Sequence, residues 1–170
     1  MQTQLCEFCL RSGMLCSKCQ EKVRSGKVND LYMRVAKFLL EIEGQHPAMQ
    51  KGRLERVLEA GGFLVLVVGR GDRSKFMDEG GKLTRDLGDQ FNRRVLVIEE
   101  GMNDRGFLED LFSSQHIVTI NIIWLPDGST ETRVVLRESG ARRLNKKRIK
   151  ALTEIAKRVR NMDLRVEYAY

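Results

Sequence analysis

Two apolar runs flank a glycine-divided segment in the stretch from Gly62 to Glu99. The first run, Phe63 to Val68, has six apolar residues without a break, which is too short for a globular helix and typical of a strand buried on both faces. Val95 to Ile98 repeats this character. After Gly80-Gly81, apolar residues recur at helical spacing, at Leu83, Leu87 and Phe91. The stretch therefore predicts a strand, a short helix, a glycine turn, a second helix and a strand.

The four cysteines all lie within the first 19 residues, as two CxxC pairs separated by six residues. Each pair offers two thiolates from one tight turn, and a tetrahedral Zn²⁺ needs four. The pattern predicts a structural zinc site formed by Cys6, Cys9, Cys16 and Cys19. A redox dithiol, an iron–sulfur cluster or two disulfides are the alternatives. A redox CxxC normally opens a helix after a strand, and nothing before Cys6 predicts that strand.

The chain is basic, and its cations are densest towards the C-terminus. Thirty Lys and Arg against 23 Asp and Glu give a net charge of +7, which favours a polyanionic partner such as nucleic acid. Residues 141–160 hold one acid, Glu154, and nine cations: Arg142, Arg143, Lys146, Lys147, Arg148, Lys150, Lys157, Arg158 and Arg160. Apolar residues between them follow helical spacing, so the cations share an outer helix face, where each could neutralise a phosphate. A solvated helix surface is the alternative interpretation.

The remaining pattern predicts an α/β (α+β) chain of two similar units. Helices are expected at 30–43, weakly around 54–58 before Gly61-Gly62, at 107–112 and at 145–160, with a polar connector at 20–27. Further strands are expected at 117–124, 132–136 and 164–168. A shift of about 68 to 70 residues superimposes the helix after Gly81 on the helix at 145–160. The expected domains are a zinc knuckle with its connector (1–28), a first unit with preceding helices (29–100) and a second unit (101–170).

Neither a membrane span nor an enzyme site is predicted. No run of 18 apolar residues occurs and the N-terminus lacks the features of a signal peptide, so we expect a cytoplasmic, reducing compartment. His46 and His116 are isolated from each other and from any acid pair, and we expect them in loops or at the surface. The loop from Gly69 to Ser74 matches a dinucleotide-binding loop only in part, because Ser74 stands where the third glycine is needed. We therefore expect a protein without catalytic activity.

The segment from Phe63 to Glu99 resembles a KH domain. The resemblance is carried by the buried strand, the GxGD-type loop, the short helix, the residues Phe76 to Lys82, the amphipathic helix and the closing strand. A KH domain clamps the backbone of about four nucleotides through the amide groups of a helix–GxxG–helix turn. The helix-before-strand order of the second half looks like the type II variety. Two such units behind a CxxC…CxxC knuckle are similar to the NusA-like KH proteins of archaea, over roughly residues 55 to 169.

This resemblance implies phosphate-contacting residues in both units. In the first unit they are Arg73, Lys75, Gly80, Gly81 and Lys82, and in the second Arg142, Arg143, Lys146, Lys147, Arg148 and Lys150. The first unit departs from the family at the tetrapeptide Asp78-Glu79-Gly80-Gly81, where two carboxylates would repel a phosphate. The equivalent residues of the second unit, Asn145 to Arg148, contain no glycine but have a charge that suits phosphate.

The leading hypothesis is therefore a zinc-stabilised, tandem KH-like protein that grips single-stranded or structured RNA by its backbone. The NusA-like resemblance implies a role in transcription elongation or termination, with RNA polymerase as a possible partner. A ribosome-associated protein that binds ribosomal RNA is the first alternative. The second is a protein-interaction module in which the KH scaffold has lost RNA binding. No small-molecule substrate is expected.

Overall fold

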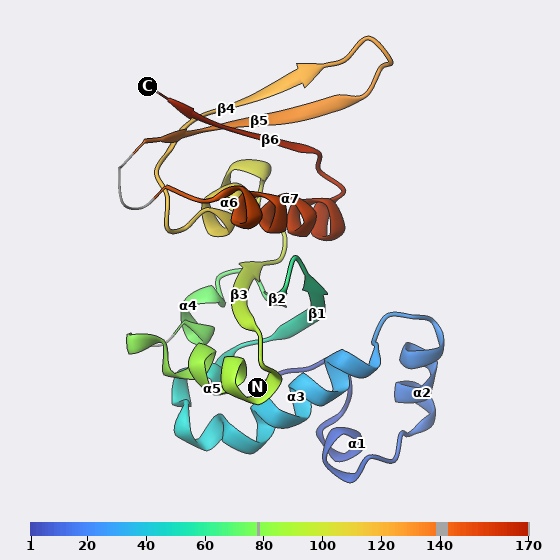
Figure 1. The fold of residues 1–170 in the computed structure, drawn as a ribbon. Coiled ribbons are helices and arrows are strands. Elements are labelled where there is room, and N and C mark those ends of the chain that lie inside the picture. The colour runs from blue at the N-terminus through green and yellow to red at the C-terminus, as the bar shows by residue number, and fades with distance from the viewer. Residues whose placement is uncertain (78, 139–142, 170) are drawn as a thin grey trace. The chain divides into compact units, whose positions relative to one another are not determined.

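The computed structural model describes residues 1–77, 79–138 and 143–169. Its fold is mixed α+β with two three-stranded sheets, which confirms the predicted fold class (Figure 1). The chain divides into two compact units: residues 1–59 with 64–101, and residues 60–63 with 102–170. Within the described residues, no helix has the length and apolar character needed to cross a membrane.

Unit 1 is built on the buried strand predicted from the sequence. Three helices come first, α1 (Glu7–Ser12), α2 (Ser17–Arg24) and α3 (Asp30–Ile42), followed by the 3-10 turns η1 (Glu43–Gln45) and η2 (Pro47–Lys51). The sheet has the order β1-β2-β3, with strands β1 (Leu54–Ala60), β2 (Phe63–Val68) and β3 (Arg94–Glu99). Between β2 and β3 lie α4 (Arg73–Phe76), the turn η3 (Glu79–Gly81) and α5 (Lys82–Phe91). Every residue of β2 is buried, so the expected order of strand, helix, glycine turn, helix and strand is confirmed.

Unit 2 repeats a similar order of elements. It contains α6 (Asp104–Leu111), β4 (Ile117–Trp124), β5 (Thr130–Arg137), α7 (Lys146–Arg160) and β6 (Leu164–Ala169). Strand β5 lies in the middle, antiparallel to β4 and parallel to β6. Helices α6 and α7 lie on one face of this sheet (Figure 1), where Val134, Leu152 and Ile155 are buried.

The internal repeat is visible in the caps as well as in the order of elements. Both sheets place their second strand in the middle. Helices α5 and α7 both end at an asparagine in the left-handed conformation, Asn92 with φ 51° and Asn161 with φ 52°. Their spacing falls within the predicted shift of about 68 to 70 residues. Asparagine tolerates this conformation better than other residues that carry a Cβ. Each of the two helices therefore ends at its asparagine.

Two local predictions were wrong. Residues 54–60 form strand β1, although Leu54, Val57 and Ala60 recur at a spacing of three that favoured a weak helix. The deciding feature is Gly61-Gly62, whose φ angles of 59° and 80° form a two-residue turn that pairs β1 with β2. The second error concerns the connector expected at 20–27, because α2 continues to Arg24.

We predict that the two turn glycines differ in their tolerance to alanine. A Cβ on Gly62 would meet nothing within 4 Å, whereas a Cβ on Gly61 would lie 2.6 Å from the Cα and the carbonyl oxygen of Ala151 in α7. Gly62→Ala should lower the free energy of unfolding by about 1 kcal/mol, from the positive φ alone. Gly61→Ala should lower it by about 3 kcal/mol, because backbone atoms of α7 cannot move aside cheaply. Denaturant unfolding measures both, and equal losses would contradict the close approach.

Candidate functional site

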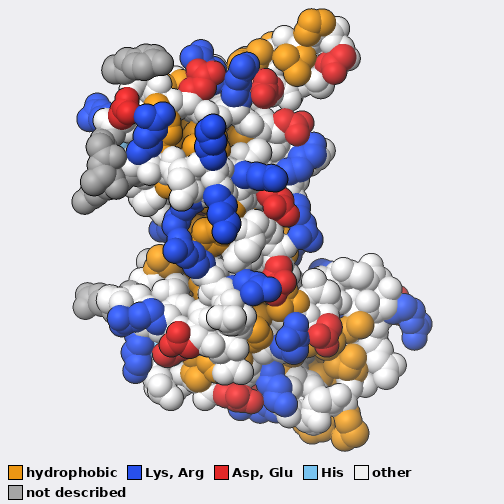
Figure 2. Space-filling model, in the orientation of Figure 1, with side chains coloured by type: hydrophobic (Ala, Val, Ile, Leu, Met, Phe, Trp, Pro, Cys, Tyr) orange, Lys and Arg blue, Asp and Glu red, His pale blue; other side chains and the backbone are white. Residues whose placement is uncertain are grey.

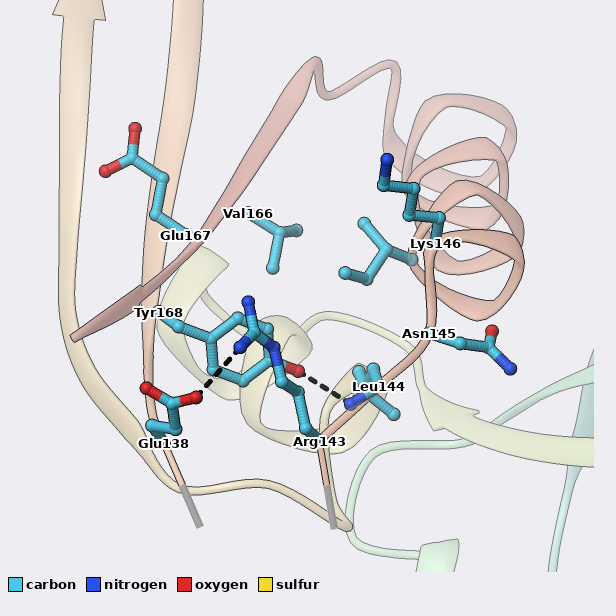
Figure 3. A pocket seen from close by; sticks show the side chains of 9 residues that line it. Glu138, Arg143, Leu144, Asn145, Lys146, Val166, Glu167 and Tyr168 are labelled. Atoms are coloured by element: carbon cyan, nitrogen blue, oxygen red, sulfur yellow. Dashed lines mark hydrogen bonds and ion pairs between the residues drawn. The ribbon is translucent and has the colours of Figure 1, made fainter. Parts of the chain in front are cut away.

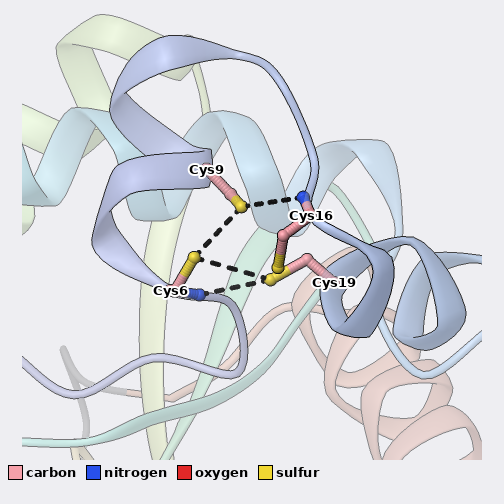
Figure 4. Close-up of side chains that lie close together, drawn as sticks. All are labelled: Cys6, Cys9, Cys16 and Cys19. Atoms are coloured by element: carbon pink, nitrogen blue, oxygen red, sulfur yellow. Dashed lines mark hydrogen bonds between the residues drawn. The ribbon is translucent and has the colours of Figure 1, made fainter.

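The four cysteines converge on one point at the N-terminus (Figure 4). Their sulfur atoms all lie within 4.8 Å of one another, and Cys6 Sγ is 3.0 Å from Cys9 Sγ and 3.8 Å from Cys19 Sγ. Each CxxC opens a helix, with Cys6 and Cys16 as the N-cap residues of α1 and α2. Gly13, with φ 77°, ends α1 and lets the chain return for the second pair.

This arrangement fits a tetrahedral metal site. Four thiolates at about 2.3 Å from a central Zn²⁺ would have sulfur–sulfur distances of about 3.8 Å, which the cluster matches within small side-chain adjustments. Two backbone N–H groups already point at sulfur: that of Cys6 donates to Cys19 Sγ at 3.4 Å, and that of Cys16 donates to Cys9 Sγ at 3.2 Å. Such hydrogen bonds orient ligands and stabilise their charge. The four cysteines can therefore hold a metal ion.

Without a metal the four thiols have unequal acidities. The backbone N–H of Cys19 lowers the pKa of Cys16 to about 7, and the neighbouring thiol of Cys9 lowers the pKa of Cys6. In contrast, the thiol of Cys6 raises the pKa of Cys9 to about 12, and burial raises the pKa of Cys19. Each CxxC therefore has an exposed, acidic first thiol and a buried, weakly acidic second thiol.

The cysteine knuckle, residues 1–24, shares the core of unit 1. Cys9 and Cys19 are buried in one cluster with α3 and β2. Tyr32 of α3 ties the segment down, because its hydroxyl accepts from the N–H of Gln4 and donates to the carbonyl of Leu54, both at 2.8 Å. Burial raises the pKa of Tyr32 to about 12. The predicted metal ligands are thus held by the same packing that supports β1.

Only some of the residues predicted to contact phosphate in unit 1 are free to contact a ligand. Gly80 and Gly81 have φ of 76° and 65°, and Lys82 is exposed at the start of α5. Arg73 and Lys75 serve the fold: Arg73 Nε donates to the carbonyl of Val97 at 3.1 Å, and Lys75 Nζ is 2.6 Å from an Asp72 carboxylate oxygen. Asp78 lies outside the described residues, so the expected repulsion of phosphate stays a prediction.

The loop from Gly69 to Ser74 already holds an anion of the chain itself. The carboxylate of Glu99 accepts from the backbone N–H of Gly71 at 3.2 Å and of Arg73 at 3.3 Å. These amides are the ones that a phosphate would need. The loop therefore fixes β3 to the start of α4.

The basic helix of unit 2 has an unusual first turn. Asn145 caps α7 by accepting from the N–H of Arg148 at 2.8 Å, and no acid follows in the first turn. Lys146, Lys147 and Lys150 are exposed, and no ion pair with another described residue involves them. Figure 2 shows Lys and Arg side chains gathered over α7. Because the N-terminus of a helix carries partial positive charge, cations there cost about 0.3–1 kcal/mol each unless an anion binds.

The other predicted cations of this segment have different surroundings. Arg148 turns inward, where its guanidinium carbon lies 5.6 Å from the centre of the Phe63 ring and its Nε has no hydrogen-bond partner among the described residues. Arg143 is paired with Glu138 at 2.8 Å. Arg142 lies outside the described residues. Among the described cations predicted in this segment, the exposed ones without an ion pair are therefore the three lysines.

A pocket of about 710 Å³ borders this first turn (Figure 3). Arg143 lies over the ring of Tyr168, 4.8 Å from its centre, and the Tyr168 hydroxyl accepts from the N–H of Leu144 at 2.8 Å. The floor is partly apolar, from Ile149 and Val166. A planar aromatic or guanidinium surface beside an apolar floor is suited to a nucleobase, and the adjacent lysines are suited to its phosphate.

Two residues of interest escaped the sequence analysis. Tyr168 was assigned only to a strand, because its position beside Arg143 depends on the parallel pairing of β6 with β5. His46 was expected in a loop or at the surface. It lies between η1 and η2 but is buried, with Nε2 3.2 Å from Asp86 Oδ2. No local pattern signals that contact, since 40 positions separate the partners.

Comparison with known proteins adds a likeness of fold. No protein-family model matches the chain, and no curated protein matches it significantly. Among solved structures, the crystal structure of APE1850 matches with a TM-score of 0.52 and 18% sequence identity. The match covers 77% of this chain and 96% of APE1850. At this identity the two proteins share a fold, and nothing about activity or partners follows.

We predict a fixed order of thiol labelling in the metal-free protein. At pH 8, above the pKa of about 7 of Cys16, iodoacetamide should modify Cys16 and Cys6 before Cys9 and Cys19, because only a thiolate attacks. Mass spectrometry of peptides after short exposures measures the order. Protein unfolded in denaturant is the control and should label evenly. Early modification of Cys9 would contradict the arrangement of the cluster.

Proposed function

We propose that the chain is a non-catalytic, NusA-like tandem KH protein that binds RNA through its backbone. The observation that carries the proposal is the first turn of α7, with three exposed lysines and no acid. A solvated helix of purely structural role gains stability from acids at this end, and this helix has none. A bound phosphate would remove the electrostatic cost and use the N–H groups that point out of the helix.

The order of elements also supports the proposal. Unit 1 runs α3, β1, β2, α4, α5 and β3, which is the helix-before-strand order that the type II KH resemblance requires. The glycine turn lies between α4 and α5, where the family has its clamp. In unit 2 the corresponding place is the start of α7, beside the pocket lined by Tyr168. We assign the stronger grip to unit 2, because Arg73 and Lys75 of unit 1 are engaged within the fold.

In this proposal the cysteine cluster holds structural Zn²⁺. Four cysteine ligands leave no open position for a reaction, and the ion would fix α1 against α2. The charge of the cluster is then set by the metal, whatever the acidities of the free thiols.

The alternatives concern the partner. Ribosomal RNA is a polyanion of the same chemistry, so a ribosome-associated role would use the same lysines. A protein-interaction module that has lost RNA binding would not need them. Salt dependence and charge reversal separate that module from both RNA-binding roles.

We predict that reversing two charges in the first turn of α7 impairs RNA binding without unfolding the protein. Lys146→Glu with Lys147→Glu should weaken affinity for a short single-stranded RNA by about tenfold or more. The slope of log affinity against log salt should fall by about 1.4, for two lost phosphate contacts on a single strand. Fluorescence anisotropy over about 50–300 mM KCl measures both. Thermal stability should be unchanged or higher, because acids suit this helix end.

The control is a pair with the same change of charge in unit 1. Lys27 and Lys37 are exposed and are not among the predicted phosphate contacts, and Lys27→Glu with Lys37→Glu should leave most of the affinity. Equal losses in the two double variants would mean that only net charge matters. A flat salt response in the wild type would overturn RNA binding altogether.

We also predict one zinc ion per chain. Elemental analysis of protein purified without chelator should find it, and Cys9→Ser should lose the metal and lower the melting temperature, whereas Ser12→Ala in the same segment should do neither. If the analysis finds iron and inorganic sulfide in place of zinc, the four cysteines hold an iron–sulfur cluster. A protein without any metal would remove the claim.

A further inference from the structure

The β4–β5 hairpin exposes most of the large apolar side chains found at the surface. The described residues include seven large hydrophobics that are exposed, and four of them lie in or just after β4: Val118 (43%), Ile122 (59%), Trp124 (75%) and Leu125 (37%). The free end of the hairpin projects beyond α6 and α7 (Figure 1), and Figure 2 shows apolar atoms at its tip. A cluster of this kind on a basic, hydrophilic protein indicates an interaction surface.

Ile122 and Trp124 lie on the face that the helices cover further along the sheet. Ile120 is paired with Val134, Ile122 with Thr132 and Trp124 with Thr130, and paired residues share a face. Val134 is fully buried, whereas Ile122 and Trp124 are open. The core layer of unit 2 is thus left uncovered along the outer part of β4.

Strand β4 is also an edge, so its outer backbone groups have no strand partner within the described part of the chain. The sheet order β4-β5-β6 gives β4 a neighbour on one side only. Edge strands normally carry a charge, a proline or a β-bulge that opposes further pairing. The sequence IVTINIIW has no charge and no proline over eight residues, and the irregularity in its register with β5 is confined to its start, between Ile117 and Thr119. The charges on β5 and β6 that face one another are already paired, as in Arg133 with Glu167 at 2.6 Å.

We propose that β4 pairs antiparallel with β4 of a second copy of this chain, which joins two unit 2 sheets into one of six strands. The sequence of β4 is self-complementary about Asn121: Ile120 and Ile122 flank it, and Val118 and Trp124 lie two positions further out. A two-fold axis at Asn121 places Ile120 opposite Ile122 of the partner and Val118 opposite its Trp124, whereas Ile123 faces Thr119. The two Asn121 amides then face each other and can hydrogen-bond.

The chemistry of the strand favours a second copy over a charged partner. An acidic peptide would gain nothing from β4, which has no cation, and RNA would find no positive charge on it. A neutral strand can approach its own copy despite the net charge of +7. One strand per copy is a small interface, below about 1,200 Å² in total, so we expect a weak dimer with a dissociation constant on the order of tens of micromolar.

The test is the oligomeric state of the full-length, RNA-free protein by sedimentation equilibrium over a concentration series. High salt is used, because it suppresses bridging by residual RNA and leaves apolar pairing intact. The wild type should pass from monomer to dimer. Ile122→Lys should weaken the dimer by about tenfold or more, since a charge at an edge strand opposes pairing. Met14→Lys, at an exposed apolar residue of unit 1, should have no effect.

A cross-link gives a second measurement that does not depend on affinity. Asn121→Cys should form a disulfide between copies under mild oxidation of the metal-loaded protein, and Ser113→Cys, at another exposed site, should not. A protein that stays monomeric at every concentration, or a dimer that Ile122→Lys leaves intact, overturns the proposal. The first result would mean that any partner of the β4 edge is a different protein. RNA affinity is measured separately, so this outcome leaves the proposed function unaffected.

Discussion

Unit 1 depends on keeping both faces of β2 out of water. All six residues of this strand are buried, so its backbone N–H and C=O groups must be paired within the protein. Strands β1 and β3 supply those partners on its two sides. The Gly61-Gly62 turn brings β1 back beside β2, and the carboxylate of Glu99 secures β3 through the loop at Gly71. Cys9 and Cys19 of the cysteine knuckle are buried in the same core, so the position of the candidate metal centre depends on the packing around β2.

Sequence reasoning succeeded where a single local signal decides the structure. Asn29, Asn103 and Asn145 each cap a helix through the side-chain oxygen, and Asn161 ends one, so the helix ends could be predicted. It failed where distant residues decide. Strand β1 has a helix-like spacing that only its pairing with β2 overrides. The pocket at Tyr168 requires β6 to pair with β5, and the burial of His46 requires Asp86 from another element.

The sequence also cannot show which cations of unit 2 are paired within the fold. A count of cations in residues 141–160 predicts a basic helix but treats all nine as equal. The structure divides them: Arg160 and Lys157 are paired with Asp104 and Asp163, and Arg148 turns towards Phe63. The α7 lysines that form no ion pair with another described residue are confined to the start of the helix, where positive charge is least favourable for stability. Stability and the proposed binding role therefore make opposite demands on the same turn.

The Glu99 carboxylate gives the loop at Gly69 to Ser74 a further property. Any free anion that approached the amides of Gly71 and Arg73 would compete with a group fixed to the same chain. A tethered competitor acts at an effective concentration of about millimolar, so a free anion would have to exceed it in affinity or concentration to displace it. The Glu99 carboxylate therefore occupies the place that a free anion would take at these two amides. In one unit these amides are occupied by a side chain of the chain itself, and in the other unit the helix end with the exposed lysines is open to solvent.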